Sequence, residues 1–501
     1  MRRRRSGCKI VDNETFGIDH LAMTYPTLRL LIDGQWLSSS SSGSLPVHNP
    51  ADGALLGELP VAGPAELQNA LAAAERGFAL WSNTLPIERW RIISRATALL
   101  RERAKGIARV LTLEQGKPLA EAEREVLLSA DIIDFLAEES RRLGARGVPA
   151  RLPGIMSQSV QRVPVGPVAA FTPWNFPANL PARKLGGALA AGCSIIIKPA
   201  EETPATCMEL LRAFVDAGLP AGVANMVAGD PAAISSTLIA APQIAKVTFT
   251  GSVAVGRLLG EQAARHLKRY TAELGGHAPV IVCDDVDARA AARLSVQAKF
   301  RNAGQVCASP IRFLVQHGVY EAFKAEFLAG ARALRIGSGL EPDVQFGPLI
   351  HERRIGAMQA LVDDALKYPQ SRLLCGGRRL ERPGSYYEPT VLEAVPLAAR
   401  VQREEPFGPI ALLDEFTDLD AAVQQANALP FGLAAYAFTN NLQRAHELAT
   451  RLRAGMVGIN HFGVSQPETP FGGVRDSGFG SESGLEGLLC YTDVKLVSMA
   501  K

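Results

Sequence analysis

The sequence has few features typical of disulfide-bonded, metal-binding, nucleic-acid-binding or membrane proteins. Its seven cysteines form no CxxC motif and no short regular spacing, which argues for free thiols in a reducing cytoplasm and against zinc. The net charge of +3 gives no general case for binding nucleic acid or a membrane surface. No apolar run reaches the length of a membrane span. We therefore expect a cytoplasmic protein with no metal, nucleic-acid or membrane partner.

The first residues are the one local exception to this balanced charge. Arg2 to Arg5 form a run of four arginines, as in a targeting or nucleic-acid-binding tag. Acidic residues follow at Asp12, Glu14 and Asp19, where a transit peptide would avoid them, and no apolar signal segment comes after the run. We expect residues 1–27 to be an unstructured extension.

Apolar residues make up 47% of the 501 residues, enough for two or three domains. Turn signals predict small β-hairpins over residues 28–60, and an Ala-, Leu-, Arg- and Glu-rich stretch predicts helices from Pro64 to about Arg142. Strand-like and helix-like segments alternate after Pro164, and a second alternation runs from Ala278 to roughly residue 475. The pattern predicts an α/β fold with two doubly wound parallel sheets.

Two segments have the pattern of exposed strands. Residues 157–165 alternate polar and apolar side chains, and residues 484–501 end in a strand-like run. We expect the C-terminal strand to pair with the 157–165 hairpin of another subunit. The two segments would then form a β oligomerisation arm in a homodimer or homotetramer.

Polar residues follow the predicted strands, at the sheet edge where parallel α/β proteins bind ligands. Asn175, between two prolines, either donates its amide to a developing oxyanion or caps the next helix. Lys198 and Glu201 either hold the two hydroxyls of a nucleotide ribose or form a solvated charge pair. Glu273 precedes two glycines in a mostly apolar loop, where a raised pKa would suit a general base.

Residues 249–256 form a glycine-containing loop that enters a predicted helix. Free backbone amides at a helix N-terminus favour a phosphate, and Gly251 and Gly256 allow close approach beside Ser252. The loop differs from the usual GxGxxG fingerprint, so by itself it does not identify the ligand.

Cys307 has small and polar neighbours, including Gly304, Gln305, Ala308 and Ser309. A cysteine that only fills a core usually lies beside large apolar residues, and that structural use is the commoner one. Here a substrate can reach the sulfur, as a nucleophile requires. Together with the loops above, the chain offers a thiol, a base, an amide donor, a ribose-binding pair and a phosphate loop.

These residues lie in motifs that resemble the NAD(P)-dependent aldehyde dehydrogenase superfamily, from about residue 31 to residue 497. The resemblance implies a nucleotide-binding domain over 28–142 and 165–275, a catalytic domain over 276–483, and an arm over 143–164 and 484–501. The motifs that carry it are Pro173-Trp-Asn-Phe-Pro177, Lys198-Pro-Ala-Glu201, Phe249-Thr-Gly-Ser252, Glu273-Leu-Gly-Gly276, Phe300-Arg-Asn-Ala-Gly-Gln-Val-Cys307, Glu405-Pro-Phe-Gly-Pro409 and Pro470-Phe-Gly-Gly473.

The resemblance also implies a role for each matching residue. Cys307 resembles the nucleophile that attacks the aldehyde, Asn175 the oxyanion donor, and Glu273 the base that activates water for thioester hydrolysis. The expected reaction converts an aldehyde, NAD and water into a carboxylate and NADH. The residues that match cofactor contacts are Trp174, Lys198, Glu201, Gly229, Gly251, Ser252, Gly256, Glu405 and Phe407.

The carboxylate at Glu201 predicts which cofactor binds. A carboxylate at Glu201 accepts hydrogen bonds from both ribose hydroxyls but repels a 2′-phosphate, so we expect NAD to be preferred over NADP. Lys198 would offset part of that repulsion.

Three further residues match the succinate-semialdehyde dehydrogenase branch, where they hold the distal carboxylate: Arg183, Arg301 and Ser465. Arg183 follows Asn175 by eight residues, about two helical turns, and a guanidinium binds carboxylate in a bidentate way. The alternative for either arginine is a surface or salt-bridged side chain. Ser309 stands where many members of that branch carry a second cysteine, so their redox switch is not expected.

The run from Cys307 to Val315 is also similar to 2-oxoglutarate-semialdehyde dehydrogenases. We rank succinate semialdehyde first, with 2-oxoglutarate and glutarate semialdehydes as alternatives. A cysteine hydrolase would need a histidine base, and none of the eight histidines lies in a comparable motif. A non-catalytic relative would have lost Cys307 or Glu273, and a CoA-dependent acylating relative usually lacks the equivalent of Glu273.

Overall fold

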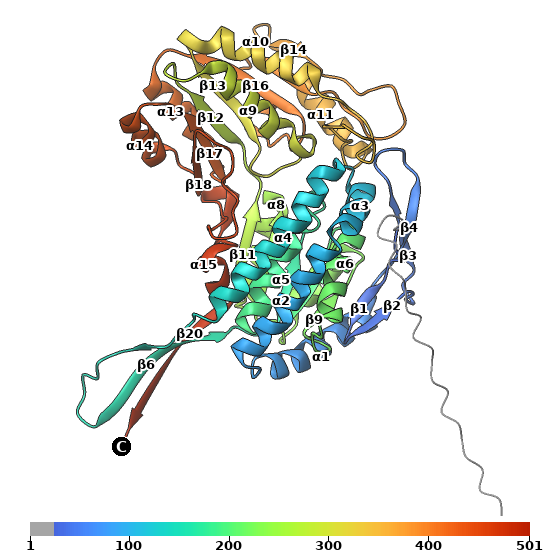
Figure 1. The fold of residues 1–501 in the computed structure, drawn as a ribbon, viewed down its shortest axis with the longest axis vertical. Helices are drawn as coiled ribbons and strands as arrows, with labels where there is room; N and C mark the ends of the chain where they lie inside the picture. Colours follow the sequence, from blue (N-terminus) through green and yellow to red (C-terminus); the bar gives the residue numbers. More distant parts are fainter. Residues whose placement is uncertain (1–24) are drawn as a thin grey trace, which may run out of the picture.

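Two β-sheets organise the chain in the computed structural model, which describes residues 25–501 (Figure 1). The arginine run and most of the predicted N-terminal extension lie outside the described residues. The first sheet has eight strands in the order β19-β11-β10-β7-β8-β9-β1-β2. These strands are β1 (Leu30–Ile32), β2 (Gln35–Leu37), β7 (Val168–Phe171), β8 (Ile195–Lys198), β9 (Ala224–Met226), β10 (Lys246–Gly251), β11 (Arg269–Leu274) and β19 (Gly478–Phe479).

The five central strands of this sheet are parallel and buried on both faces, which confirms the predicted α/β pattern. Along β7, Val168 and Ala170 pack into one apolar core, whereas Ala169 and Phe171 pack into the core on the other face. This alternation is the two-residue period of a strand. Helices cover both faces: α1 (Pro64–Trp81), α2 (Pro86–Glu102), α3 (Ala104–Gln115), α4 (Leu119–Ser140), α5 (Asn179–Ala191), α6 (Pro204–Asp216), α7 (Pro231–Ala240) and α8 (Val253–Arg265).

The second sheet has seven strands in the order β14-β15-β16-β13-β12-β17-β18, with only β14 antiparallel to its neighbour. Its strands are β12 (Ala278–Val282), β13 (Pro310–Gln316), β14 (Arg372–Cys375), β15 (Thr390–Glu393), β16 (Ile410–Phe416), β17 (Ala434–Phe438) and β18 (Met456–Ile459). Its helices are α9 (Ala288–Phe300), α10 (His317–Ala333), α11 (Glu352–Ala365), α12 (Arg400–Arg403), α13 (Leu419–Asn427) and α14 (Leu442–Arg451).

A three-stranded arm extends away from both sheets, at the lower left of Figure 1. It consists of β5 (Arg146–Gly147), β6 (Ile155–Pro164) and β20 (Thr492–Ala500), and β20 follows the short helix α15 (Gly484–Leu489). The expectation that β20 pairs with another subunit is wrong, because β20 pairs antiparallel with β6 of the same chain. Both strands leave the body at one point, where the Val165 N–H donates to the Tyr491 carbonyl at 3.1 Å.

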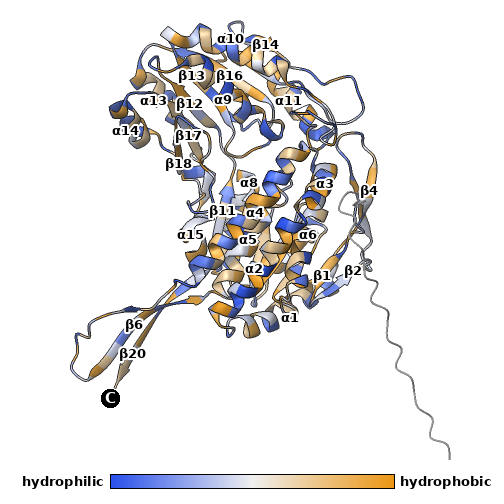
Figure 2. Cartoon of the chain, viewed as in Figure 1, coloured by the Kyte–Doolittle hydropathy of each residue, from blue (hydrophilic) through white to orange (hydrophobic). Residues whose placement is uncertain are grey.

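The arm exposes several apolar side chains on neighbouring strands. Figure 2 shows hydrophobic and hydrophilic residues mixed along its strands. Val494, Leu496 and Met499 on β20 and Met156 on β6 are each more than half exposed.

A separate hairpin, β3 (Ser44–His48) and β4 (Leu55–Pro60), lies beside α3 and α6 in Figure 1. Within residues 25–501, no helix is both long and apolar enough to cross a bilayer.

Candidate active site

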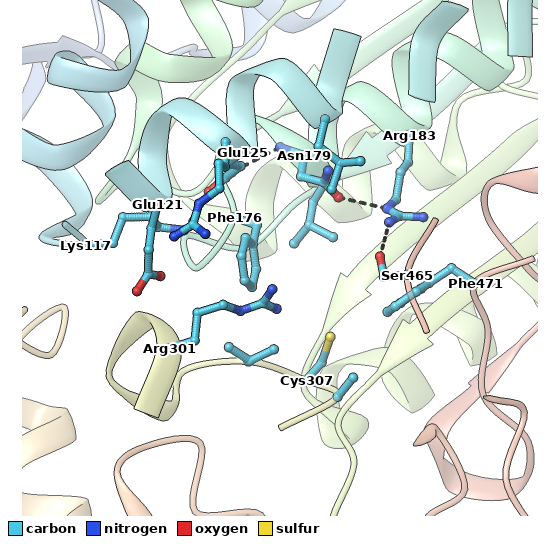
Figure 3. A pocket seen from close by; sticks show the side chains of 15 residues that line it. Lys117, Glu121, Glu125, Phe176, Asn179, Arg183, Arg301, Cys307, Ser465 and Phe471 are labelled. Atoms are coloured by element: carbon cyan, nitrogen blue, oxygen red, sulfur yellow. Dashed lines mark hydrogen bonds and ion pairs between the residues drawn. The ribbon is translucent and has the colours of Figure 1, made fainter. Parts of the chain in front are cut away.

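Two cavities meet at Cys307, each of about 340 Å³. The arginine cavity, shown in Figure 3, is lined by Lys117, Glu121, Arg124, Glu125, Leu128, Phe176, Asn179, Leu180, Arg183, Arg301, Val306, Cys307, Ala308, Ser465 and Phe471. The aromatic cavity is lined by Pro173, Trp174, Asn175, Leu180, Thr250, Gly251, Ser252, Glu273, Leu274, Gly275, Cys307, Arg354, Glu405, Phe407 and Phe471. The motifs at the carboxyl ends of the parallel strands β7, β10 and β11 thus line one cavity with Cys307, which lies on the loop before β13.

The thiol is placed by an unusual left-handed turn after α9. Asn302, Ala303 and Gly304 have φ angles of 50, 53 and 73°. Glycine is required at the third position because a Cβ there would overlap the Gly408 carbonyl oxygen. The Gln115 amide donates to the Asn302 side-chain oxygen at 2.8 Å and fixes the turn from α3. The backbone therefore reaches Cys307 in one defined conformation, with the sulfur half-buried.

The environment of Cys307 disfavours the thiolate. Burial raises the pKa of the thiol to about 12, and the negative charges of Glu405 and Glu273 raise it further in the same direction. The Arg183 cation lowers it. At neutral pH the sulfur consequently holds its proton, and nucleophilic attack needs a proton acceptor beside it.

Asn175 lies in the loop before α5, with its amide directed toward the cysteine loop. Its Nδ2 donates to the Gln305 carbonyl at 3.1 Å, which leaves the second amide N–H for another acceptor. Asn175 does not cap α5, because that helix begins at Asn179 with Ala178 before it and no side-chain cap. The predicted two-turn helical spacing between Asn175 and Arg183 is also wrong, because Pro173 and Pro177 keep the loop out of the helix.

Glu273 lies on β11 rather than in a loop, and its side chain is 2% exposed. Neither carboxyl oxygen has a hydrogen-bond partner among the described residues. Burial raises the pKa of Glu273 well above its ordinary value, and the nearby Glu482 carboxylate raises it further. Lys184 and Arg183 lower it. An unpartnered carboxyl group that faces the same cavity as Cys307 has the properties of a proton acceptor for that thiol or for a water molecule.

A buried ion pair lies behind Glu273. The Lys184 ammonium, on α5, pairs with the Glu482 carboxylate and donates to the Thr248 hydroxyl at 3.1 Å. Both charged side chains are at most 1% exposed. The charge on Glu482 is therefore fixed close to Glu273 and contributes to its high proton affinity.

Arg183 is a buried cation with hydroxyl and amide partners. Its Nε donates to the Asn179 side-chain oxygen at 3.0 Å and its Nη2 to Ser465 Oγ at 2.7 Å (Figure 3). Its Nη1 donates to Ser483 Oγ. The guanidinium also lies 4.6 Å from the centre of the Phe471 ring. No carboxylate of the described residues forms an ion pair with it, so its charge is available to an anion in the cavity.

Arg301 projects into the same cavity from the other side in Figure 3. Its guanidinium lies 5.5 Å from the centre of the Phe176 ring, and it forms no ion pair within residues 25–501. Arg183, Arg301 and Ser465, all three of the predicted tail-binding residues, thus line one cavity together with Cys307.

The aromatic cavity combines an aromatic pair, a buried carboxyl group and a helix N-terminus. Trp174 and Phe407 meet edge to face with centroids 5.4 Å apart. Glu405 accepts the Gly276 N–H at 3.0 Å, and burial raises the pKa of its carboxyl to about 7. A Cβ on Gly275 would overlap Glu405, so glycine is needed for this close approach. Ser252 caps α8 by accepting the Val255 N–H at 3.4 Å, at the edge of the cavity.

Four predicted cofactor residues lie outside the lining of this cavity. Lys198 and Glu201 form an ion pair whose side chains are 7% and 25% exposed, so the pair is more buried than a solvated surface pair. Gly256 lets α8 pack on β11, because a Cβ there would overlap Leu274. Gly229 has a φ of 131° beside Val61, a backbone conformation that favours glycine.

Three residues that hold the site together stand outside the motifs described above: Lys117, Glu125 and Ser483. Lys117 lies between Gly116 and Pro118, at the junction of α3 and α4. A lysine at a helix junction is usually exposed, so its burial here depends on tertiary packing that the sequence does not report. Glu125 and Ser483 also carry no sequence signal, because their partners are distant in the chain.

Comparison with known proteins agrees with this geometry. Residues 36–497 match the aldehyde dehydrogenase family. A 4-(hydroxymethyl)benzenesulfonate dehydrogenase of Comamonas testosteroni is 48% identical, over 94% of this chain and 98% of that protein. An NADP-linked succinate-semialdehyde dehydrogenase of Escherichia coli is 41% identical, over 93% and 96%. The crystal structure of succinate-semialdehyde dehydrogenase from Burkholderia pseudomallei, 40% identical, superposes with a TM-score of 0.92 over 95% of this chain and 98% of that one.

Proposed function

The chain belongs to the aldehyde dehydrogenase family, and from this premise we propose that it oxidises an aldehyde with a distal anionic group, using Cys307 as nucleophile and NAD as hydride acceptor. One observation carries the proposal. Cys307 is shared by two cavities, one with unpaired arginines and the other with a helix N-terminus and an aromatic slot. An anionic aldehyde and a dinucleotide can thus reach the same sulfur from different sides.

In the proposed reaction, the thiol proton passes to Glu273 as the sulfur attacks the aldehyde carbon. The resulting oxyanion accepts the free N–H of Asn175 and the backbone N–H of Cys307. When bound, NAD supplies the hydride acceptor, and loss of hydride converts the thiohemiacetal on Cys307 into a thioester. Glu273 first gives the thiol proton to solvent and then takes a proton from water, whose oxygen attacks the thioester carbon. Collapse releases the carboxylate product and the thiolate, which takes up a proton to restore the thiol.

The proposed cofactor contacts fit the residues present. Glu405 and Phe407 would hold the nicotinamide ribose, and Trp174 and Ser252, with Gly251 at the start of α8, would hold the pyrophosphate. The Lys198–Glu201 pair would bind the adenosine ribose, where the carboxylate favours NAD over NADP by repelling a 2′-phosphate. The Escherichia coli relative is named for NADP(+), so we propose measuring this preference directly.

For the substrate, we propose a semialdehyde with a carboxylate tail, with succinate semialdehyde first and 2-oxoglutarate and glutarate semialdehydes as alternatives. Arg183 supports this because it is 2% exposed and has no carboxylate partner of its own among residues 25–501. A bidentate carboxylate would satisfy its remaining donors, and Arg301 would add a second charge.

A second candidate is an aromatic aldehyde with a sulfonate tail. The observation in its favour is the 48% identity to the benzenesulfonate-related dehydrogenase of Comamonas testosteroni. Leu128, Phe176, Leu180 and Phe471 give the arginine cavity apolar walls that can contact a ring. A sulfonate remains ionised at all physiological pH values and offers three acceptor oxygens to Arg183 and Ser465.

The deciding experiment measures NADH or NADPH formation with a panel of aldehydes. The panel contains the three semialdehydes, 4-formylbenzenesulfonate, benzaldehyde and propanal, each with NAD and with NADP. We expect kcat/KM for anionic aldehydes to exceed that for propanal by about a hundredfold or more, because Arg183 gains a charged partner. Arg183→Gln should remove that advantage and leave propanal oxidation. Equal rates for propanal and the anionic aldehydes in the unmodified enzyme would refute an anionic substrate.

The chemical roles have their own test. Cys307→Ala should abolish turnover. Glu273→Gln should slow the attack of the thiol, which loses its proton acceptor, and slow thioester hydrolysis more, so that intact-protein mass spectrometry detects an acyl-enzyme after aldehyde and NAD are added. Full steady-state turnover by Glu273→Gln would refute its role as base.

We also propose a homo-oligomer in a reducing cytoplasm. The exposed apolar residues of the arm support the oligomer. All six cysteines of residues 25–501 are free thiols, which supports the reducing compartment.

A further inference from the structure

Lys117 and Glu125 form an ion pair in the wall of the arginine cavity. The Lys117 ammonium lies 2.5 Å from a Glu125 oxygen, and the side chains are 1% and 3% exposed. Removing two charges from water offsets much of their mutual attraction, so stability alone does not account for such a pair. Its other contacts point to a role in the reaction.

Lys117 holds the loop before α5, which carries the oxyanion donor Asn175. Lys117 Nζ donates to the backbone carbonyl of Asn175 at 2.8 Å and lies 4.0 Å from the centre of the Phe176 ring. The Asn302 amide donates to the same Asn175 carbonyl at 2.8 Å. Asn175 is thereby tied both to α4, through the ion pair, and to the left-handed turn that leads to Cys307.

The glutamate end of the pair holds the start of α5. The second Glu125 oxygen accepts the N–H groups of Ala178 and Asn179 at 2.9 and 3.1 Å. These groups have no partner within the helix and need an acceptor from elsewhere. Asn179 in turn orients Arg183 through its side-chain oxygen. Glu125 thus fixes the helix end from which the anion-binding arginine projects.

We propose that the Lys117–Glu125 pair is a positioning unit that sets the oxyanion donor Asn175 and the tail-binding Arg183 at a fixed separation from Cys307. The inference rests on the proposed function, because it assigns the two ends of the pair to the two ends of one substrate. Loss of the lysine end should affect every aldehyde, since every aldehyde uses the oxyanion donor. Loss of the glutamate end should affect anionic aldehydes most.

The test compares kcat/KM for one anionic aldehyde, the best of the panel above, and for propanal, per folded protein. Lys117→Met should lower kcat/KM for both aldehydes by about tenfold to a hundredfold, the cost of misplacing a reacting group by about 1 Å. Lys324→Met is the matched control, because Lys324 also pairs with a buried carboxylate, Glu393 at 3.0 Å, away from both cavities. The control should keep both values within about twofold of the unmodified enzyme.

The second pair of variants separates positioning from general stability. Glu125→Ala removes the acceptor for the α5 N–H groups, so the ratio of anionic to neutral kcat/KM should fall about tenfold. Glu125→Gln retains an acceptor oxygen and should restore most of that ratio. A purely structural role would lower the folded fraction without changing the ratio.

The outcomes separate the inference from the function on which it rests. If the unmodified enzyme does not prefer anionic aldehydes, the proposed substrate class fails. If it does, and Lys117→Met and Glu125→Ala keep its rates and its preference, the positioning role fails alone. If Lys117→Met does not fold, the comparison of Glu125→Ala with Glu125→Gln decides. Equal ratios of anionic to neutral kcat/KM in these two variants would overturn the positioning role of the ion pair.

Discussion

At the scale of single residues, burial and the neighbouring charges determine the pH at which Glu273 can accept a proton. Burial raises the pKa of Glu273, the Glu482 carboxylate raises it further, and Lys184 and Arg183 lower it. A general base works only in its deprotonated form, so the rate of thioester hydrolysis should rise with pH up to the raised pKa. An anionic substrate on Arg183 would offset one of the two cations and favour the protonated form further.

Replacing Glu482 tests this arrangement. Glu482→Gln removes the negative charge that raises the pKa of Glu273 and leaves the Lys184 cation unpaired, and both changes lower that pKa. The rising limb of the pH profile for hydrolysis should therefore move to lower pH. The measurement is the pH dependence of acyl-enzyme decay in single-turnover experiments. The control is Glu486→Gln, a change at an exposed position on α15. If the rising limb of the Glu482→Gln profile stays in place or moves to higher pH, Glu273 is not the base under the influence of Glu482.

The residue types at the site could be predicted from the sequence, but their contacts could not. Cys307, Glu273 and Asn175 were found because each stands out in its own motif. The partners of Arg183 were only partly found, because Ser483 lies 300 residues away and has no motif. Such contacts depend on tertiary packing, which local sequence patterns do not report.

At the scale of secondary-structure elements, the left-handed turn at 302–304 is the most constrained feature near the thiol. An L-residue with a side chain in this conformation costs about 1–2 kcal/mol, and a Cβ at Gly304 would also overlap the Gly408 carbonyl. Gly304→Ala should therefore lower kcat strongly and lower Tm as well, as measured by NADH formation and thermal unfolding.

A glycine in an open position provides the matched control. Gly356, on α11, has no atom within 4 Å of an added Cβ. Gly356→Ala should raise stability by about 1 kcal/mol through helix propensity and leave kcat unchanged. If Gly304→Ala behaved like this control, the turn would not be what places the thiol.

Helices and strands with a clear periodicity of apolar residues were predicted well. The helices between residues 64 and 140 and the central strands have the expected positions, because proline, glycine and apolar runs mark their ends. The break at Arg103 between α2 and α3 was not predicted, since no proline or glycine marks it. The helix α5 begins at Asn179, so Arg183 lies within it and Asn175 lies in the loop before it. The expected helical spacing between these two residues is wrong for this reason.

At the scale of the whole molecule, the arm is the feature from which we predict self-association. Leu496 is 60% exposed on β20, a strand at the edge of a three-stranded sheet. Exposed apolar side chains on an edge strand favour association with a second copy. Native mass spectrometry should find a homodimer or homotetramer, and an exclusively monomeric protein would refute this.

One substitution links the assembly to the arm. Leu496→Lys should reduce the assembly to a smaller species, because a charge on the edge strand opposes burial. Leu442→Lys, at an 85% exposed position on α14, should leave the mass unchanged. The same assembly for both variants would exclude the arm as the contact surface.

The position of Cys307 between two cavities has a consequence for the stability of the enzyme toward reactive chemicals. An alkylating agent or an oxidant can approach the sulfur through either cavity, so a ligand that fills one of them leaves the other approach open. Inactivation by iodoacetamide should therefore slow only in part with cofactor alone or with an inert anionic analogue alone. Protection should be complete only when both are present together.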